Sequence, residues 1–334
     1  MFDKKKVKDI DYLAISARVR AKENYLLTAE RMERMLEAKT DEEAFKVLTE
    51  CGYEVGEMTP QALERLIAAE REKLFSDFGT SVTDTGMMDV FKIKYDYHNA
   101  KTLLKGEAVG VEADYLLAPS GRIDPKRIGE AVLQNDYRAL PGVLSGALGQ
   151  AKEVLASTQD PQLADLILDK ACYKEMRQTA DKYDSAFLAG YVKVLIDSIN
   201  LKSTVRALRM KKGADFLRSV LVEGGKVSPE GVVSAVFGAG SVITAFTGCG
   251  LDAASELGEN AVKGGRLTAF EKACDDAVTA YLRNSRYVAF GESVLIAYLA
   301  AKENELTAVR VILSGRLAGV SADAIRERLR EAYV

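Results

Sequence analysis

The sequence is constrained most by a pattern that recurs at nearly equal intervals along its 334 residues, an asparagine followed six positions later by a cation. The three pairs are Asn99 and Lys105, Asn200 and Arg206, and Asn304 and Arg310, at intervals of 101 and 104 residues. The residue before each cation is apolar, so a helix carrying the pattern can bury one side and keep polar groups on another. This spacing predicts an internal repeat.

A second match follows the first two copies. Residues 121–125 read GRIDP and residues 225–229 read GKVSP, so both have a glycine, a cation, a β-branched residue, a capping residue and a proline. Asp or Ser at the N-cap accepts a backbone N–H, and Pro at the first helical position leaves no donor unpaired. A shorter version without the proline occurs at 319–325. These matches predict turns that lead into helices.

The repeat also predicts how the chain is divided. Lys-Ala-Cys precedes the second copy at 170–172 and the third at 272–274. A chain of this length exceeds the size at which a single core usually stops growing, so several modules are expected. We place them at residues 1–140, 141–245 and 246–334.

Apolar residues recur at helical spacing, and alternation typical of strands is rare. Tyr12, Ile15 and Val19 have this spacing near the N-terminus, and Thr28, Thr40 and Thr59 are expected to cap the next helices. The predicted class is therefore all-α, with three similar helical bundles.

Charge and cysteine content exclude several functions. The formal net charge of −3 exerts no long-range attraction toward nucleic acid or an anionic membrane. Four cysteines without a Cys-x-x-Cys spacing indicate reduced, partly buried thiols in a cytoplasmic protein. The opening MFDKKKVKDIDY has no apolar segment of the kind found in signal peptides.

One uncharged stretch has the length of a membrane span. Residues 231–251 contain no charged side chain over 21 positions, but five of them are glycine. The corresponding stretch of the first copy, LQNDYRALPG, is a polar break between short helices. We therefore expect Gly238–Gly240 to be the same break, and no span.

No catalytic pattern stands out. His98 is the single histidine, which excludes a metal site built from several histidines, and we interpret it as a partly packed helix residue. Gly238–Ser241 lacks the third glycine and the preceding strand of a dinucleotide loop, and no P-loop motif occurs. Acidic pairs such as Glu303 and Glu305 are interpreted as charged surface. We predict no catalytic, cofactor-binding or metal residues, which favours a binding or mechanical protein.

Three stretches resemble one family. YLAISARVRAKENYLL at 12–27, YDYHNAKTLLKG at 95–106 and KENELTAVRVILSGRLAGVSADAIRERL at 302–329 are similar to the family of the C subunit of V-type and A-type ATP synthases, which includes the d subunit of vacuolar proton pumps. The resemblance implies a funnel of three helical modules with pseudo-threefold symmetry. Its narrow end would rest on the cytoplasmic face of the membrane proteolipid ring, and its mouth would accept the rotor shaft of D and F type subunits.

The resemblance also implies a role without chemistry. Such a protein, present once per complex, binds no nucleotide or cofactor, lacks an active site and transmits torque between shaft and ring during ion transport. Whether the ion is H⁺ or Na⁺ is decided by other chains. A soluble all-α repeat scaffold that binds another protein is the alternative that the residues leave open.

Six residues are candidates for partner-facing or inter-module surfaces. They are Arg18, Arg20 and Glu23 near the start and Asn304, Glu305 and Arg310 near the end. Hydrogen bonds between helices within a module are the alternative, above all for the asparagines. The third copy has Ala301 where the others have aspartate, so a strictly symmetric set of contacts is not expected.

Overall fold

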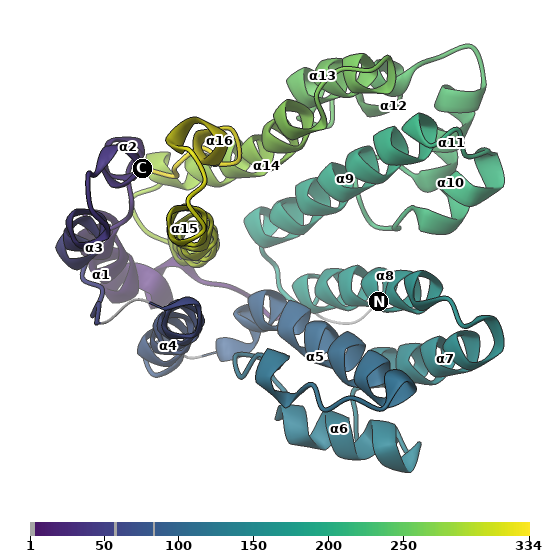
Figure 1. The fold of residues 1–334 in the computed structure, drawn as a ribbon, viewed down its shortest axis with the longest axis horizontal. Coiled ribbons are helices and arrows are strands. Elements are labelled where there is room, and N and C mark those ends of the chain that lie inside the picture. Colours follow the sequence, from purple (N-terminus) through teal and green to yellow (C-terminus); the bar gives the residue numbers. More distant parts are fainter. Residues whose placement is uncertain (1–3, 57–58, 83) are drawn as a thin grey trace.

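The computed structural model describes residues 4–56, 59–82 and 84–334, and these residues form helices and no strand (Figure 1). The α-helices are α1 (Leu13–Glu23), α2 (Ala29–Glu37), α3 (Asp41–Glu50), α4 (Pro60–Gly79), α5 (Asp89–Val109), α6 (Pro125–Gln134), α7 (Gly142–Thr158), α8 (Pro161–Ala180), α9 (Ala186–Arg209), α10 (Ala214–Val220), α11 (Pro229–Phe237), α12 (Val242–Phe246), α13 (Asp252–Val262), α14 (Leu267–Arg283), α15 (Glu292–Leu317) and α16 (Ala322–Arg326). Short 3₁₀ turns are η1 (Asp9–Tyr12), η2 (Thr85–Met87), η3 (Asp114–Leu116) and η4 (Asn284–Tyr287). The all-α prediction is confirmed.

Three long helices carry the repeated asparagines. They are α5, α9 and α15, with 21, 24 and 26 residues. Their first turns share one core, in which Phe91 stacks on Tyr191 with ring centroids 5.5 Å apart and Val294 is fully buried. The later turns of α9 and α15 lie in two separate cores. The long helices therefore meet at their N-terminal ends and diverge, as α5 and α9 do toward the right of Figure 1.

The helices pack in groups around these three. α5 packs with α6 and α8, α9 packs with α13 and α14, and α15 packs with α1, α2, α4 and α16. This grouping differs from the expected ranges 1–140, 141–245 and 246–334, because Leu63 and Ile67 of α4 share a core with Leu306 and Val309 of α15. The N-terminal helices thus complete the packing of the C-terminal ones. A funnel with pseudo-threefold symmetry stays a prediction.

The repeated asparagine has the same contacts in two copies. Asn99 donates to the carbonyl of Ala118 and accepts its N–H, both at 2.8 Å. Asn200 makes the same pair with Val222, again at 2.8 Å. Each asparagine therefore clamps the chain that returns after its long helix. Asn304 is exposed, so the third copy keeps the residue at a different kind of position.

The GRIDP and GKVSP matches form a second clamp. Asp96 accepts the N–H of Arg122 at 2.8 Å, and Asp197 accepts the N–H of Lys226 at 2.9 Å. The glycine before each cation is required by this approach, because a Cβ at Gly225 would lie 2.0 Å from Asp197 Oδ1. The expected turn and cap are confirmed in both copies.

The repeated cations bind acids on the helix packed alongside. Lys105 pairs with Asp165 of α8 at 3.1 Å and Arg206 with Glu271 of α14 at 2.6 Å. In the third copy Arg310 pairs with α4, from the other end of the chain. The ion pair between the repeated cation and an acid of a neighbouring helix therefore recurs in all three copies. If α8 and α14 are aligned by these two acids, Asp165 and Glu271, the Lys-Ala-Cys matches at 170–172 and 272–274 do not coincide. They are offset from each other by about one helical turn.

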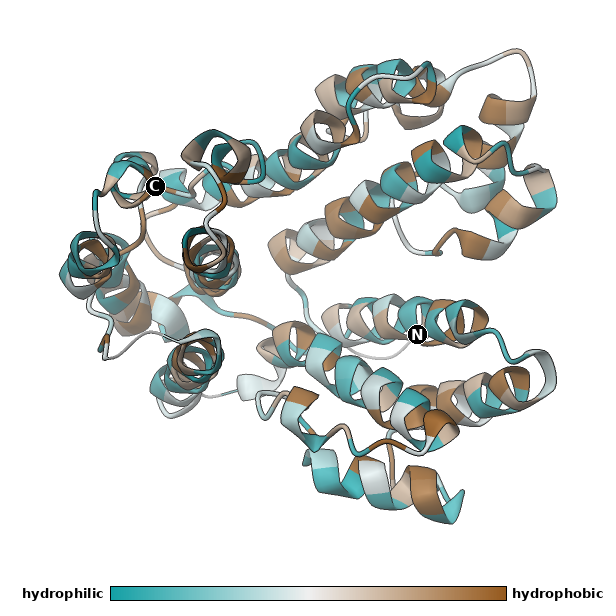
Figure 2. Cartoon of the chain, viewed as in Figure 1, coloured by the Kyte–Doolittle hydropathy of each residue, from teal (hydrophilic) through white to brown (hydrophobic). Residues whose placement is uncertain are grey.

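The uncharged stretch is broken where the sequence predicts. α11 ends at Phe237 and α12 begins at Val242. None of the helices described is long and apolar enough to cross a bilayer. Hydrophobic and hydrophilic residues are mixed along the long helices (Figure 2).

Candidate partner interface

Helix α1 is apolar on two sides. Its sequence LAISARVRAKE buries Ile15, Ser16 and Val19 against the core. Ala17 and Ala21, four residues apart on one face, are exposed, and Leu13 on the same face is 49% exposed. A helix at a protein surface usually turns polar residues outward, so this face is unusual.

The exposed face of α1 continues into neighbouring segments. We call the combined area the α1 surface, and it consists of Ile10, Leu13, Ala14, Ala17, Ala21, Tyr25, Tyr287, Val288 and Phe290. Tyr287, Val288 and Phe290 belong to η4 and the loop after it, which touches α1 where Gly291 N donates to Ser16 Oγ at 3.2 Å. Tyr287 is 90% exposed and Ile10 66%. Exposed apolar residues gathered on neighbouring segments can mark an interaction site.

Two arginines hold α1 between its neighbours. Arg18 donates to the carbonyl of Asp77 at the end of α4, at 3.0 Å, and its guanidinium lies 5.3 Å from the centre of the Phe78 ring. Arg20 donates to the carbonyls of Ser285 and Val288 at 2.7 and 2.8 Å. These two predicted residues therefore border the α1 surface and position it.

Glu23 works with Arg20. Its carboxylate accepts two hydrogen bonds from Arg20 at 2.9 Å and a longer one from Tyr333 at 3.3 Å. Glu23 thus orients the guanidinium that holds the 285–288 loop. The structure brings Arg18, Arg20 and Glu23 together at α1, and their role toward a partner stays a prediction.

The three predicted residues of α15 have different surroundings. Asn304 is exposed beside a cavity of about 30 Å³. Glu305 is buried and accepts the N–H of Leu27 and the hydroxyl of Tyr53, both at 2.5 Å. Arg310 pairs with Glu64 at 2.7 Å. For Glu305 and Arg310 the structure shows contacts between helices, and a partner contact by any of the three stays a prediction.

The interpretation of Glu303 and Glu305 as charged surface was wrong. Glu303 is 6% exposed and accepts from Arg71 at 3.1 Å, Lys94 at 3.1 Å and the hydroxyl of Tyr95 at 2.5 Å. Burial by itself raises the pKa of Glu303, yet Lys94 and Arg71 hold it below its ordinary value. This network joins α4, α5 and α15. Charge spacing along one helix does not reveal it, because the partners come from distant segments.

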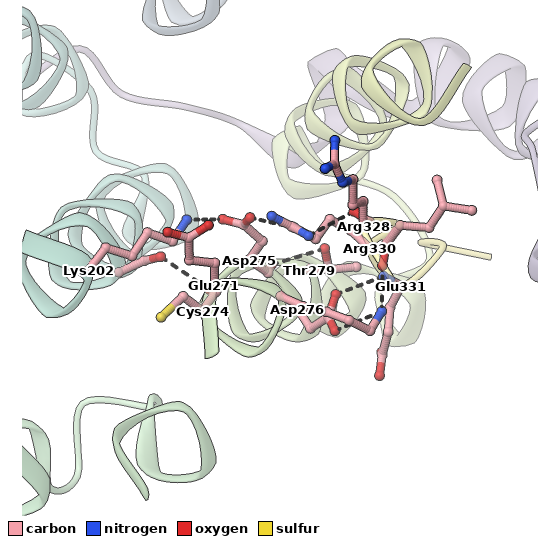
Figure 3. Close-up of polar contacts among 12 residues, drawn as sticks. Lys202, Glu271, Cys274, Asp275, Asp276, Thr279, Arg328, Arg330 and Glu331 are labelled. Atoms are coloured by element: carbon pink, nitrogen blue, oxygen red, sulfur yellow. Dashed lines mark hydrogen bonds and ion pairs between the residues drawn. The ribbon is translucent and has the colours of Figure 1, made fainter. Parts of the chain in front are cut away.

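A polar network also fixes the C-terminal segment to α14 (Figure 3). Asp275 binds both Lys202 of α9 and Arg330, the latter at 2.6 Å. Asp276 accepts the N–H of Glu331 at 2.7 Å. Asp275, which pairs with Lys202 of α9, thereby also holds the C-terminal segment.

Other sequence candidates carry no site. His98 is exposed rather than packed, and its Nε2 lies 3.0 Å from the carbonyl oxygen of Leu116. All four cysteines are buried and free, and burial raises the pKa of Cys172 and Cys274 to about 12. Among the described residues no group of His, Cys, Asp and Glu is arranged to hold a metal ion.

Comparison with known proteins identifies the family. The sequence model of the ATP synthase (C/AC39) subunit family matches residues 15–328, which include most of α1 and the whole of α15. The chain belongs to this family. Its members in V-type and A-type machines are structural components of rotary ATPases, so the chain is non-catalytic, as the sequence predicted.

Relatives from both kinds of machine match most of the chain. The C subunit of the V-type sodium ATPase of Enterococcus hirae is 24% identical over 328 residues, 97% of this chain and 99% of its own length. The C subunit of the A-type ATP synthase of Methanocaldococcus jannaschii is 24% identical over 95% of this chain and 86% of its own. That of Haloferax volcanii is 28% identical over 71% of both. The chain is therefore similar to V-type and A-type proteins alike.

Proposed function

We propose that this protein links the rotor shaft to the membrane proteolipid ring and transmits torque between them, as a single copy on the cytoplasmic side of a V-type or A-type ATPase. The observation that carries the proposal is the arrangement of the three long helices. They meet in one core at their first turns and separate toward their ends. A protein whose long helices are joined at one end and diverge at the other can bind the membrane ring at one end and the rotor shaft at the other.

The proposed modules follow the packing. The first is α5 to α8, the second is α9 to α14, and the third combines α15 and α16 with α1 to α4. In each module the long helix packs against a helix that lies directly before a long helix in the sequence or is joined to one by short segments. The packed pairs are α5 with α8, α9 with α14 and α15 with α4, and in chain order α8 leads into α9, α14 into α15 and α4 into α5. The third module therefore contains helices from both ends of the chain.

Torque transmission requires that the modules resist sliding. The buried network of Glu303 with Arg71 and Lys94 joins α15 to α4 and α5, and the side chains must remain paired because an unpaired buried charge is costly. Asp275 similarly links α9, α14 and the C-terminal segment. Such links support a rigid body under load.

We place the contact with the ring at the α1 surface. It lies at the joined end, since Tyr12, Ile15 and Val19 belong to the core shared by the first turns of the long helices. An apolar centre bordered by polar groups is typical of a protein interface, and Arg18, Arg20 and Glu23 form part of that border. Asn304 and Arg310 lie on α15 and stay candidates for contact with the shaft.

Binding to purified partners tests the proposal. The full chain is titrated separately with detergent-solubilised ring and with the D–F shaft complex. Ala21→Glu, which adds a charge and bulk to the α1 surface, is expected to weaken ring binding at least tenfold and to leave shaft binding unchanged. Ala156→Glu on the exposed face of α7 is the matched control and should change neither. A chain that binds neither ring nor shaft would refute the proposal.

A further inference from the structure

Three lysines line one side of the N-terminal segment next to the α1 surface. The segment 4–8 is extended, and Lys5 forms a bridge with Tyr183, its N–H donating to the carbonyl of Lys182 at 2.8 Å. The Lys5 side chain pairs with Asp84 at 2.6 Å, and Val7 packs against the central core. Side chains alternate along an extended chain, so Lys4, Lys6 and Lys8 lie on the opposite side from Lys5 and Val7.

These three lysines, which we call the lysine edge, are exposed, and they form no ion pair with any residue that the structure describes. The segment continues without interruption into Ile10 and Leu13 of the α1 surface. Asp9 and Asp11 are the acidic residues of this stretch, and Arg286 adds a further exposed cation beside Tyr287. The face therefore combines exposed cations with exposed apolar and aromatic side chains.

We propose that the lysine edge and the adjoining part of the α1 surface bind the anionic surface of a lipid bilayer directly. Lysines attract anionic headgroups, while Ile10 and Tyr287 can enter the interfacial layer, where tyrosine is favoured. The net charge of −3 opposes this attraction for the molecule as a whole, so binding depends on presenting this face. A proteolipid ring is surrounded by lipid, but the inference goes beyond the proposed function because it requires neither ring nor shaft.

Vesicle sedimentation with the full chain tests this inference. Vesicles of phosphatidylcholine alone are compared with vesicles containing phosphatidylglycerol, at low and at physiological salt. We expect binding only to the anionic vesicles, and weaker binding as salt rises. Lys4→Glu, Lys6→Glu and Lys8→Glu combined should weaken it on the order of a hundredfold, since each lysine near such a surface contributes about a factor of five.

A matched variant controls for overall charge. Lys39→Glu, Lys46→Glu and Lys126→Glu combined change the net charge equally at exposed positions elsewhere, and these lysines too form no ion pair within the described structure. This control should bind more than tenfold better than the lysine-edge variant. Ile10→Ser with Tyr287→Ser tests the apolar part and should weaken binding without changing its salt dependence.

Three results would overturn the inference. They are no binding to anionic vesicles, equal binding to neutral ones, and equal loss in the lysine-edge variant and its control. If the detergent-solubilised ring binds the protein and the anionic vesicles do not, the lipid inference is refuted and the α1 surface is a protein-binding surface. The proposed function would then be unaffected. Circular dichroism of each variant establishes that the exposed substitutions leave the fold intact.

Discussion

Replacing the three repeated asparagines one at a time tests whether all three stabilise the fold or only the two that clamp a returning segment. Asn200→Ala removes two hydrogen bonds of 2.8 Å and leaves both backbone groups of the buried Val222 without partners. Each unsatisfied buried group costs about 1 to 3 kcal/mol, so the loss of both partners should lower the free energy of unfolding by about 2 to 6 kcal/mol. Asn99→Ala breaks the same pair at Ala118, which is half-buried and can bind water instead. A loss of about 1 to 2 kcal/mol is expected there.

Asn304→Ala provides the contrast. This side chain is exposed, and alanine is the better helix former, so the change should be neutral or stabilising by about 0.5 kcal/mol. Urea unfolding followed by far-ultraviolet circular dichroism measures all three variants, and the comparison holds where the slope m is unchanged. The expected order of destabilisation is Asn200, Asn99, Asn304. Equal shifts for all three, or a larger shift for Asn304 than for Asn200, would refute the reasoning.

Further predictions concern the second clamp, the buried network and α1. Gly225→Ala should lower the thermal midpoint clearly, because its Cβ would meet Asp197 Oδ1 at 2.0 Å, whereas Gly79→Ala, with open space around it, should not. Glu303→Gln should destabilise the chain by about 3 kcal/mol at pH 7, since it leaves Arg71 without its buried partner. The pKa of Glu303 is lowered by folding, so its stabilisation is present above the ordinary value of 4.5 and is lost as pH falls through the folded value. The difference between Glu303→Gln and the native chain, measured by urea unfolding, should therefore shrink below about pH 4.5. Arg20→Ala should speed amide hydrogen exchange in the 285–288 loop, with exchange in α9 unchanged.

The repeat could be read from the sequence because its parts are local. A glycine, a capping residue and a proline specify a turn and a helix start within a few residues, and apolar spacing specifies a helix. The caps at Thr28, Asp124 and Ser228 and the break after Phe237 followed from such short patterns. The resemblance of three stretches to one ATP synthase family likewise depended only on the order of residues.

Tertiary structure alone decided which helices meet. The packing of α4 on α15 joins residues more than two hundred positions apart, and the burial of Glu303 depends on Arg71 and Lys94 reaching it from two other helices. The exposed face of α1 is a further case, because its alanines resemble core residues in the sequence and remain outside only since no other described helix covers them. Local patterns determine which helices form, whereas burial depends on which distant segments come to lie against them.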